Sequence, residues 1–137
     1  MPALAGILET ALYVADLDLA ARFYEEVIGL QRLDGDARFR AYAVAGHDVL
    51  LLFKQGESSK AVQLPGGVIP PHDGFGQNHF AFAIEASELP AWEEQLARCG
   101  VAIESRVRWP RGGVSLYFRD PHQNLLELAT RGIWAIY

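Results

Sequence analysis

The chain has 137 residues, half of them hydrophobic, and a formal charge of −5 at pH 7. This length allows one domain with a sizeable core, and the acidic balance argues against nucleic acid or an anionic membrane surface as a partner. The sequence has a single cysteine, its first residues do not show a basic region followed by a long apolar stretch, and no apolar run approaches the roughly 20 residues of a membrane span. We therefore expect a cytoplasmic protein that acts on a small molecule.

The first part of the chain predicts a strand, a short helix and three further strands. Residues 7–14 form the first strand. Asp16 is a good helix N-cap, and apolar residues recur at helical spacing until Gly29 ends the helix. Turn-forming residues then separate three predicted strands, at 30–33, 38–45 and 49–54.

The middle segment, 55–77, is crowded with proline and glycine between residues 65 and 76. Such a composition cannot sustain a helix or a central strand. Long connections of this kind are usually functional or mobile. We expect this segment to connect two modules, and it is a candidate lid.

The second part repeats the order of the first. A strand at 78–85 precedes a helix that we expect Ser87 to cap and Gly100 to end. Cys99, near the end of that helix, is expected to be a buried structural thiol. Three strands follow, at 101–109, 114–119 and 125–129.

The two parts read as copies of one unit about 70 residues apart, because Glu9 aligns with His79 and Val14 with Ile84. Two half-units that cannot bury their own faces must pair, which sets the fold and places the cleft. The predicted class is α+β, in a single domain. Its parts are module 1 at 1–54, a connecting loop at 55–77, module 2 at 78–130 and a C-terminal tail at 131–137.

Three ionisable residues, Glu9, His79 and Glu127, lie within apolar strands. Strand alternation places each on a face with small or apolar neighbours. These neighbours are Ala11 and Tyr13 for the first residue, Ala81 and Ala83 for the second, and Leu125 and Ala129 for the third. An ionised carboxylate in such surroundings costs several kcal/mol unless it is paired, protonated or bound to metal. Two carboxylates and an imidazole around one divalent cation would relieve this cost.

Simpler alternatives stay open for each residue. Glu9 would point to solvent if its strand lies at a sheet edge, and His79 would be a hydrogen-bonded core histidine. Glu127 would pair with Arg106 or Arg108.

Other residues are candidates for substrate contact. Arg106, Arg108 and Arg111 lie within six positions and would hold a carboxylate or phosphate, or else be solvated surface arginines. Aromatic residues would line the cavity or belong to ordinary core packing: Tyr13, Phe75, Trp109 and Tyr117. The remaining histidines, His47, His72 and His122, lie in loops and turns, where a direct role is not expected, and His122 is expected to be exposed.

Several motifs resemble the vicinal oxygen chelate superfamily, which includes glyoxalase I, fosfomycin-resistance proteins, bleomycin-resistance proteins and extradiol dioxygenases. The resemblance covers nearly the whole chain and is specific for the superfamily rather than for one reaction. It rests on Leu12-Tyr13-Val14-Ala15-Asp16-Leu17, Phe23-Tyr24, Gly29-Leu30, His79-Phe80-Ala81-Phe82, Phe118-Arg119-Asp120-Pro121 and Asn124-Leu125-Leu126-Glu127-Leu128.

The resemblance implies a pair of βαβββ modules whose strands curl into a glyoxalase-like mixed sheet around a cup. It also implies that Glu9, His79 and Glu127 hold a divalent metal, which would be Mn, Ni, Zn, Fe, Co or Mg. Leu51 occupies the position of a further glyoxalase I ligand and has no donor atom. The expected site thus has three protein ligands and open positions for substrate or water.

The resulting functional prediction is a metal-dependent, glyoxalase-like lyase or isomerase. It would chelate a small oxygen-rich substrate and stabilise an enediolate-like oxyanion, with Glu127 or Glu9 as the base. Two alternatives are an extradiol-type dioxygenase and a metal-free small-molecule binding protein of the bleomycin-resistance type. A homodimer is expected, with aromatic surface supplied by Trp134 and Tyr137.

Overall fold

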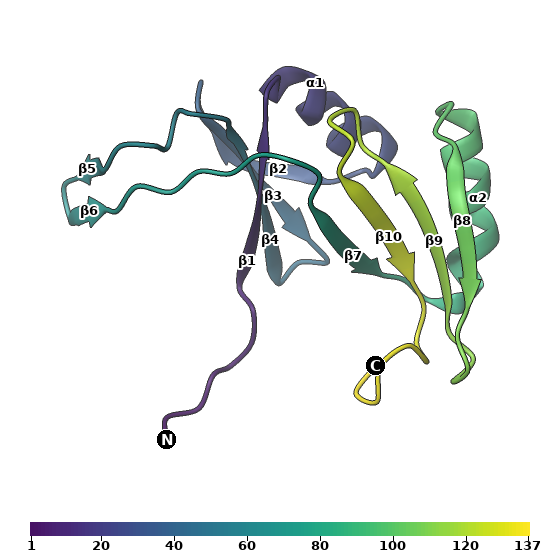
Figure 1. Cartoon of the computed structure of the whole chain (residues 1–137). Helices are drawn as coiled ribbons and strands as arrows, with labels where there is room; N and C mark the ends of the chain where they lie inside the picture. Colours follow the sequence, from purple (N-terminus) through teal and green to yellow (C-terminus); the bar gives the residue numbers. More distant parts are fainter. The chain divides into compact units, whose positions relative to one another are not determined.

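A computed structural model describes residues 1–137 and divides them into two compact units, unit 1 (Met1–Phe75) and unit 2 (Gly76–Tyr137). The elements of both units are labelled in Figure 1. Unit 1 contains β1 (Glu9–Val14), α1 (Leu17–Arg22), the π-helical turn η1 (Phe23–Val27), β2 (Gln31–Gly35), β3 (Phe39–Val44), β4 (Asp48–Lys54), β5 (Val62–Leu64) and β6 (Gly67–Ile69). Unit 2 contains β7 (His79–Ala83), the 3₁₀ helix η2 (Ala86–Glu88), α2 (Leu89–Arg98), β8 (Ile103–Arg108), β9 (Val114–Arg119) and β10 (Leu125–Ala129).

The internal duplication is visible in the strand order of the two four-stranded sheets. Unit 1 has the order β1-β4-β3-β2, and unit 2 has the equivalent order β7-β10-β9-β8. In each sheet the first strand pairs in parallel with the last, and the other pairs are antiparallel. The predicted α+β class with two βαβββ modules is therefore confirmed. The units also share register, because Ala11 pairs with Leu51 as Ala81 pairs with Glu127.

Helix α1 begins where the sequence predicts. The carboxylate of Asp16 accepts a hydrogen bond from the Leu19 N–H at 2.9 Å, which satisfies one of the free donors at the helix start. Leu17 and Ala20 are buried on the face that packs against β3 and β4. The helix widens into η1 and ends at Gly29, whose φ of 80° disfavours any residue with a Cβ.

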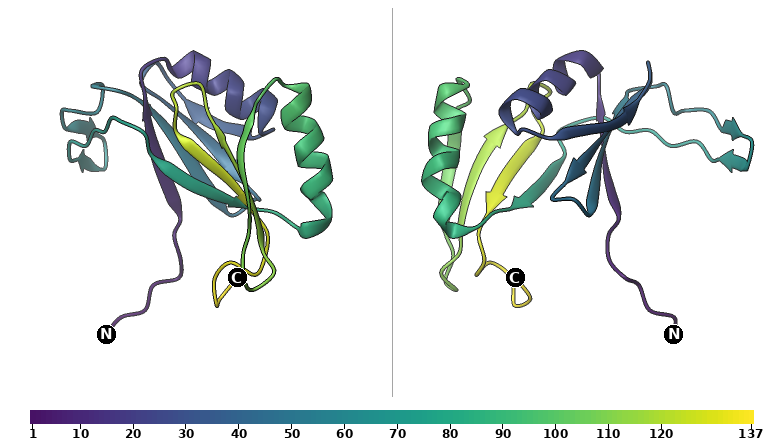
Figure 2. Two further views of the ribbon diagram at one scale, coloured as in Figure 1. Left: turned by 45° about the vertical axis from the view of Figure 1, so that its right-hand side comes forward. Right: turned by 180° about the vertical axis from the view of Figure 1, so that it is seen from behind.

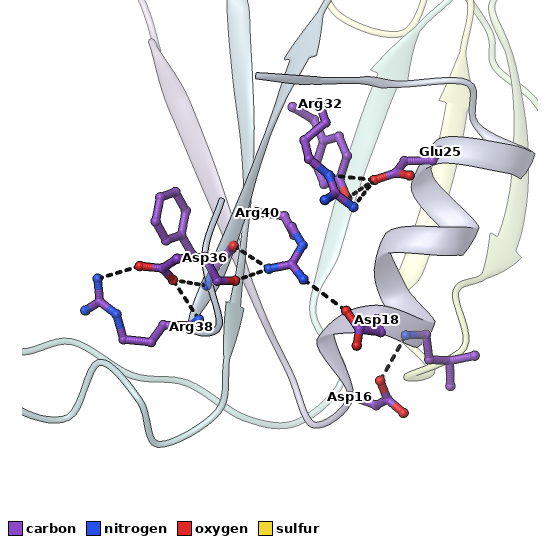
Figure 3. Close-up of polar contacts among 10 residues, drawn as sticks. Asp16, Asp18, Glu25, Arg32, Asp36, Arg38 and Arg40 are labelled. Atoms are coloured by element: carbon purple, nitrogen blue, oxygen red, sulfur yellow. Dashed lines mark hydrogen bonds and ion pairs between the residues drawn. The ribbon is translucent and has the colours of Figure 1, made fainter. Parts of the chain in front are cut away.

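Ion pairs join α1 and η1 to the sheet of unit 1, as Figure 3 shows. Arg40 of β3 contacts Asp18 at 2.9 Å, and Arg32 of β2 contacts Glu25 at 2.6 Å. These contacts link the helical layer to strands β2 and β3.

The start of α2 differs from the prediction, because Ser87 does not cap it. The chain enters α2 through η2, in which the Glu88 N–H donates to the Glu85 carbonyl at 3.0 Å. Pro90, in the first turn, has no N–H that needs a partner. A tightened turn and a proline thus replace the side-chain cap.

The prediction of a buried thiol at Cys99 is wrong, because this residue is exposed. The last buried position of α2 is Leu96, and Cys99 lies beyond it at the helix end. Its sulfur accepts a hydrogen bond from Gln95 at 3.5 Å. The sequence pattern placed the helix correctly, but the last turn of the helix lies outside the core.

The connecting segment contains a two-stranded hairpin, β5 and β6, that composition did not predict. The hairpin lies at the end of two arms that extend away from the sheet of unit 1 (Figures 1 and 2). Two hydrogen bonds hold the base of the arms. The backbone N–H of His72 donates to the Ser58 carbonyl at 2.9 Å, and the Asp73 carboxylate accepts from the backbone N–H of Gly56 at 3.0 Å. None of the helices combines the length and apolar character needed to cross a lipid bilayer.

Candidate metal and substrate site

Unit 2 contains a cavity of about 360 Å³ over β7 and β10. Its lining confirms the predicted strand faces, because His79, Ala81 and Ala83 of β7 lie beside Glu127 and Ala129 of β10. The alanine side chains are short, which leaves the space open. Five aromatic and aliphatic residues complete the wall: Trp109, Tyr117, Ile133, Trp134 and Tyr137.

His79 and Glu127 face each other in this cavity. The Nδ1 of His79 lies 2.9 Å from the Leu125 carbonyl oxygen, and Nε2 lies 3.4 Å from Glu127 Oε2. A carbonyl oxygen only accepts, so Nδ1 carries a proton and donates it, and in neutral imidazole Nε2 then presents a lone pair. Two acceptors that face each other repel unless a proton or a metal ion lies between them. This pair therefore has the donor chemistry of a metal site.

Two consecutive hydrogen bonds hold the Glu127 side chain in place. Only 6% of Glu127 is exposed, and its Oε1 accepts a hydrogen bond from the Ser115 hydroxyl. The Trp109 indole N–H donates to the oxygen of Ser115 at 2.7 Å. Ser115 thus holds Oε1, and Oε2 stays directed at His79.

Sequence reasoning missed Ser115. Its signal lies in strand alternation, since Ser115 and Tyr117 share a face of β9 and Tyr117 pairs directly with Glu127.

Tyr117 supplies a hydroxyl to the same cavity. Burial and then the nearby negative charge of Glu127 raise the pKa of Tyr117 above its usual range. Its ring lies 6.1 Å from the ring of His79. The phenol therefore keeps its proton at neutral pH and can donate a hydrogen bond to a ligand oxygen.

Glu9, the third predicted ligand, belongs to unit 1. It lies on β1, which is an edge strand, and its side chain is exposed. Glu9 lines a separate hollow of about 480 Å³ within unit 1, together with Leu51 and His72. The structure thus brings together His79 and Glu127, and within neither unit do three histidine, cysteine or acidic side chains cluster. The three-residue ligand set stays a prediction.

The arginines predicted to hold an anion lie outside the lining of both hollows. Arg106 forms an ion pair with Glu93 of α2, and Arg108 is exposed. Neither pairs with Glu127, whose partners are Ser115 and His79.

Of the four predicted aromatic residues, Trp109 and Tyr117 line the unit 2 cavity, whereas Phe75 is 88% exposed. Tyr13 lies in unit 1, where its hydroxyl contacts His72 Nδ1 at 2.6 Å. His72 also lines the unit 1 hollow, which its loop position did not suggest.

The two other loop histidines are not part of either hollow. His47 is exposed and lies 3.0 Å from Asp48. His122 is half-buried rather than exposed, because the Asp120 carboxylate draws the turn inward by accepting its backbone N–H at 2.8 Å.

The family model of the Glyoxalase/Bleomycin resistance protein/Dioxygenase superfamily matches residues 6–128. The chain belongs to this superfamily. The resemblance stated from the motifs is thereby confirmed, and the glyoxalase-like fold with it.

Three superfamily members are informative. The crystal structure of lactoylglutathione lyase from Agrobacterium tumefaciens superposes with a TM-score of 0.87 at 34% identity, over 96% of this chain and 98% of that one. Metallothiol transferase FosB from Bacillus licheniformis is 28% identical over 94% of this chain and 77% of its own length. Fosfomycin resistance protein FosX from Listeria innocua is 27% identical over 91% of this chain and 89% of its own length. These similarities support a metal-dependent vicinal oxygen chelate enzyme.

Proposed function

We propose that the protein is a metal-dependent, glyoxalase-like lyase or isomerase that chelates a small oxygen-rich substrate and stabilises an enediolate-like oxyanion. The observation that carries this proposal is the 3.4 Å approach of His79 Nε2 to Glu127 Oε2 within one cavity. The other ring nitrogen of His79 donates to the Leu125 carbonyl, as the second nitrogen of a metal-ligating histidine typically does.

The metal would be held by His79 and Glu127 of unit 2 with Glu9 of unit 1. Two carboxylates and one neutral imidazole suit a divalent ion such as Mn, Ni, Zn, Fe, Co or Mg, and they leave positions open for substrate. A bound divalent ion would supply positive charge to substrate oxygens as a Lewis acid.

The chain's own residues would supply the proton chemistry. Glu127 would accept a proton at Oε2, because Ser115 occupies Oε1. The alternative base is the exposed carboxylate of Glu9. Tyr117 would donate a hydrogen bond to the oxygen on which negative charge develops. Trp109 and the alanine floor would exclude water from this step.

The first substrate class to assay is a hemithioacetal of a thiol and a 2-oxoaldehyde, since the Agrobacterium structure is described as a lactoylglutathione lyase. A second candidate function is thiol transfer or fosfomycin resistance, because one curated relative is described as a metallothiol transferase and the other as a fosfomycin resistance protein. Catechol cleavage with oxygen consumption would instead indicate the dioxygenase alternative.

Metal analysis of protein purified without chelators tests the proposal. We expect about one divalent ion per chain by inductively coupled plasma mass spectrometry. His79→Ala and Glu127→Gln should each lower metal affinity by at least about tenfold, because each removes a ligand atom. Turnover of the hemithioacetal should fall with metal content.

His47→Ala is the matched control, because His47 is exposed and lies outside both hollows. It should leave metal content and turnover unchanged. Metal-free protein whose melting temperature does not respond to any of the six ions would contradict the proposal and favour the metal-free binding protein.

A further inference from the structure

The hollow of unit 1 is the internal counterpart of the unit 2 cavity. Leu51 of β4 pairs with Ala11 as Glu127 of β10 pairs with Ala81, so Leu51 occupies the place of Glu127 in the repeated module. The duplicated fold thus provides a second concave site that lacks the buried carboxylate. Its volume of about 480 Å³ lies within the range of roughly 300 to 1,000 Å³ that is typical of small-molecule sites.

The walls of this hollow are mainly apolar. Phe39, Leu51 and Phe53 come from the sheet, and the hairpin supplies Val62, Leu64 and Ile69. Val62 pairs with Ile69, whereas the next pair, Gln63 with Val68, lies on the opposite face of the hairpin and outside the hollow. The hairpin therefore directs one apolar face at the space between itself and the sheet.

His72 provides one hydrogen-bond donor to this space. The Tyr13 hydroxyl lies 2.6 Å from His72 Nδ1, and we assign the hydroxyl as the donor in this hydrogen bond. With this assignment the ring proton of a neutral imidazole lies on Nε2. Phe53 packs edge-on against His72 with 4.7 Å between ring centroids, which fixes the ring. The Nε2–H has no partner within the chain and is available to a ligand.

Charge at this hollow disfavours an anion. Its ionisable residues besides His72 are Glu9, Asp34 and Arg38, with formal charges that sum to −1. The guanidinium of Arg38 already contacts the Asp36 carboxylate at 3.1 Å. The imidazole Nε2–H of His72 carries a partial positive charge, which disfavours a cation next to it.

We propose that the unit 1 hollow binds an uncharged small molecule with an aromatic or branched aliphatic body and one carbonyl or ether oxygen that accepts from His72 Nε2–H. This inference concerns unit 1 alone and goes beyond the proposed function. Binding of the apolar body itself requires no metal.

Four probes of one size test this proposal on the full chain in EDTA: acetophenone, ethylbenzene, benzoate and benzylamine. Dissociation constants come from ¹H–¹⁵N chemical shifts of Leu51, Val62 and Ile69. We expect acetophenone to bind about fivefold more tightly than ethylbenzene, the effect of one neutral hydrogen bond. Benzoate and protonated benzylamine should bind at least about tenfold more weakly than acetophenone, because a charge loses hydration in an apolar hollow.

Variants locate the binding. Leu51→Trp should fill the hollow and abolish binding of both neutral probes, and Ile69→Glu on the hairpin should do so without altering the sheet. His72→Phe should abolish the preference for acetophenone over ethylbenzene while keeping affinity for the aromatic body. Val68→Ala, on the outer face of the hairpin, is the matched control and should change nothing.

The inference is overturned if a charged probe binds as tightly as acetophenone, or if folded protein shows no shift with either neutral probe. Because EDTA removes metal, this failure is distinct from failure of the metal site. If the protein binds acetophenone but takes up no metal, the inference about the unit 1 hollow is supported and the proposed metal-dependent function is contradicted.

Discussion

At the scale of single residues, Tyr42 shows how burial and one hydrogen bond set a protonation state. Tyr42 is fully buried, and its hydroxyl donates to Glu25 at 2.9 Å. Burial first, and then the hydrogen bond and charge of Glu25, raise the pKa of Tyr42 to about 12. For Glu25, burial acts in the opposite direction, but hydrogen bonds from Arg32 and Tyr42 lower its pKa. The two groups thus hold one proton firmly on the tyrosine.

Tyr42→Phe should alter the alkaline stability of the protein. The unfolded tyrosine loses its proton near pH 10, whereas the folded one keeps it until about pH 12. Its contribution is therefore complete below pH 10 and is lost as the pH rises from 10 to 12. Urea unfolding at several pH values should show the wild type losing about 2 kcal/mol more than Tyr42→Phe over this window. Parallel stability curves for the two proteins would contradict this assignment.

At the scale of elements, the C-terminal tail of unit 2 depends on a close backbone contact. The Gly113 N–H donates to the Gly132 carbonyl at 3.2 Å, where the tail meets the turn between β8 and β9. A Cβ added to Gly132 would lie 2.7 Å from the Gly113 nitrogen, closer than real side chains approach. This contact places Trp134 and Tyr137 in the wall of the unit 2 cavity.

Gly132→Ala should therefore detach the tail and lower stability. Gly112→Ala is a matched control, because Gly112 has nearly the same φ, 97° against 98°, and no atom within 4 Å of its added Cβ. Both variants carry the backbone strain of about 1 kcal/mol, and only Gly132→Ala adds the clash. Chemical denaturation should show a larger loss for Gly132→Ala, with a tryptophan fluorescence change confined to that variant. Equal losses would show that the contact adds nothing beyond strain.

At the scale of the whole molecule, the two repeats have diverged in chemistry while keeping one topology. In unit 2 the equivalent strand position holds the buried Glu127, and in unit 1 it holds Leu51. The helix-facing positions stay apolar in both, with Leu12 and Val14 matched by Phe82 and Ile84. The face of each sheet that packs against a helix is thus apolar in both units. The opposite face differs, because it carries a carboxylate in unit 2 and a leucine in unit 1.

We propose that the protein forms a homodimer in solution. Large apolar side chains are exposed in both units, among them Leu8, Phe75, Trp134 and Ile136. Burying such surface is the main driving force for association. Light scattering after size exclusion should give twice the chain mass of 15.1 kDa. Trp134→Ser with Ile136→Ser should shift the mass towards one chain, and a wild-type monomer at high concentration would refute the proposal.

How far the sequence predicts the site depends on the kind of information each residue carries. Strand alternation is local, so it predicted that His79, Ala81 and Ala83 share a face with an open space above them. The partners of Glu127 are not local: Ser115 lies twelve positions away along the chain and Trp109 still farther. The ion pair of Arg106 with α2 likewise depends on packing between elements and could not be read from the spacing of the arginines.

Sequence by itself determined the repeat, the order of strands and helices within each module, the superfamily, and the faces of the strands that carry Glu9, His79 and Glu127, because these follow from periodicity and from turn residues near in the chain. Only the tertiary structure decided which acceptor faces His79, which side chain contacts His72, and that residues 62–69 form a hairpin over a hollow. The physical reason is that tautomers, hydrogen-bond partners and cavities depend on groups far apart in sequence, whose meeting is set by strand register and packing.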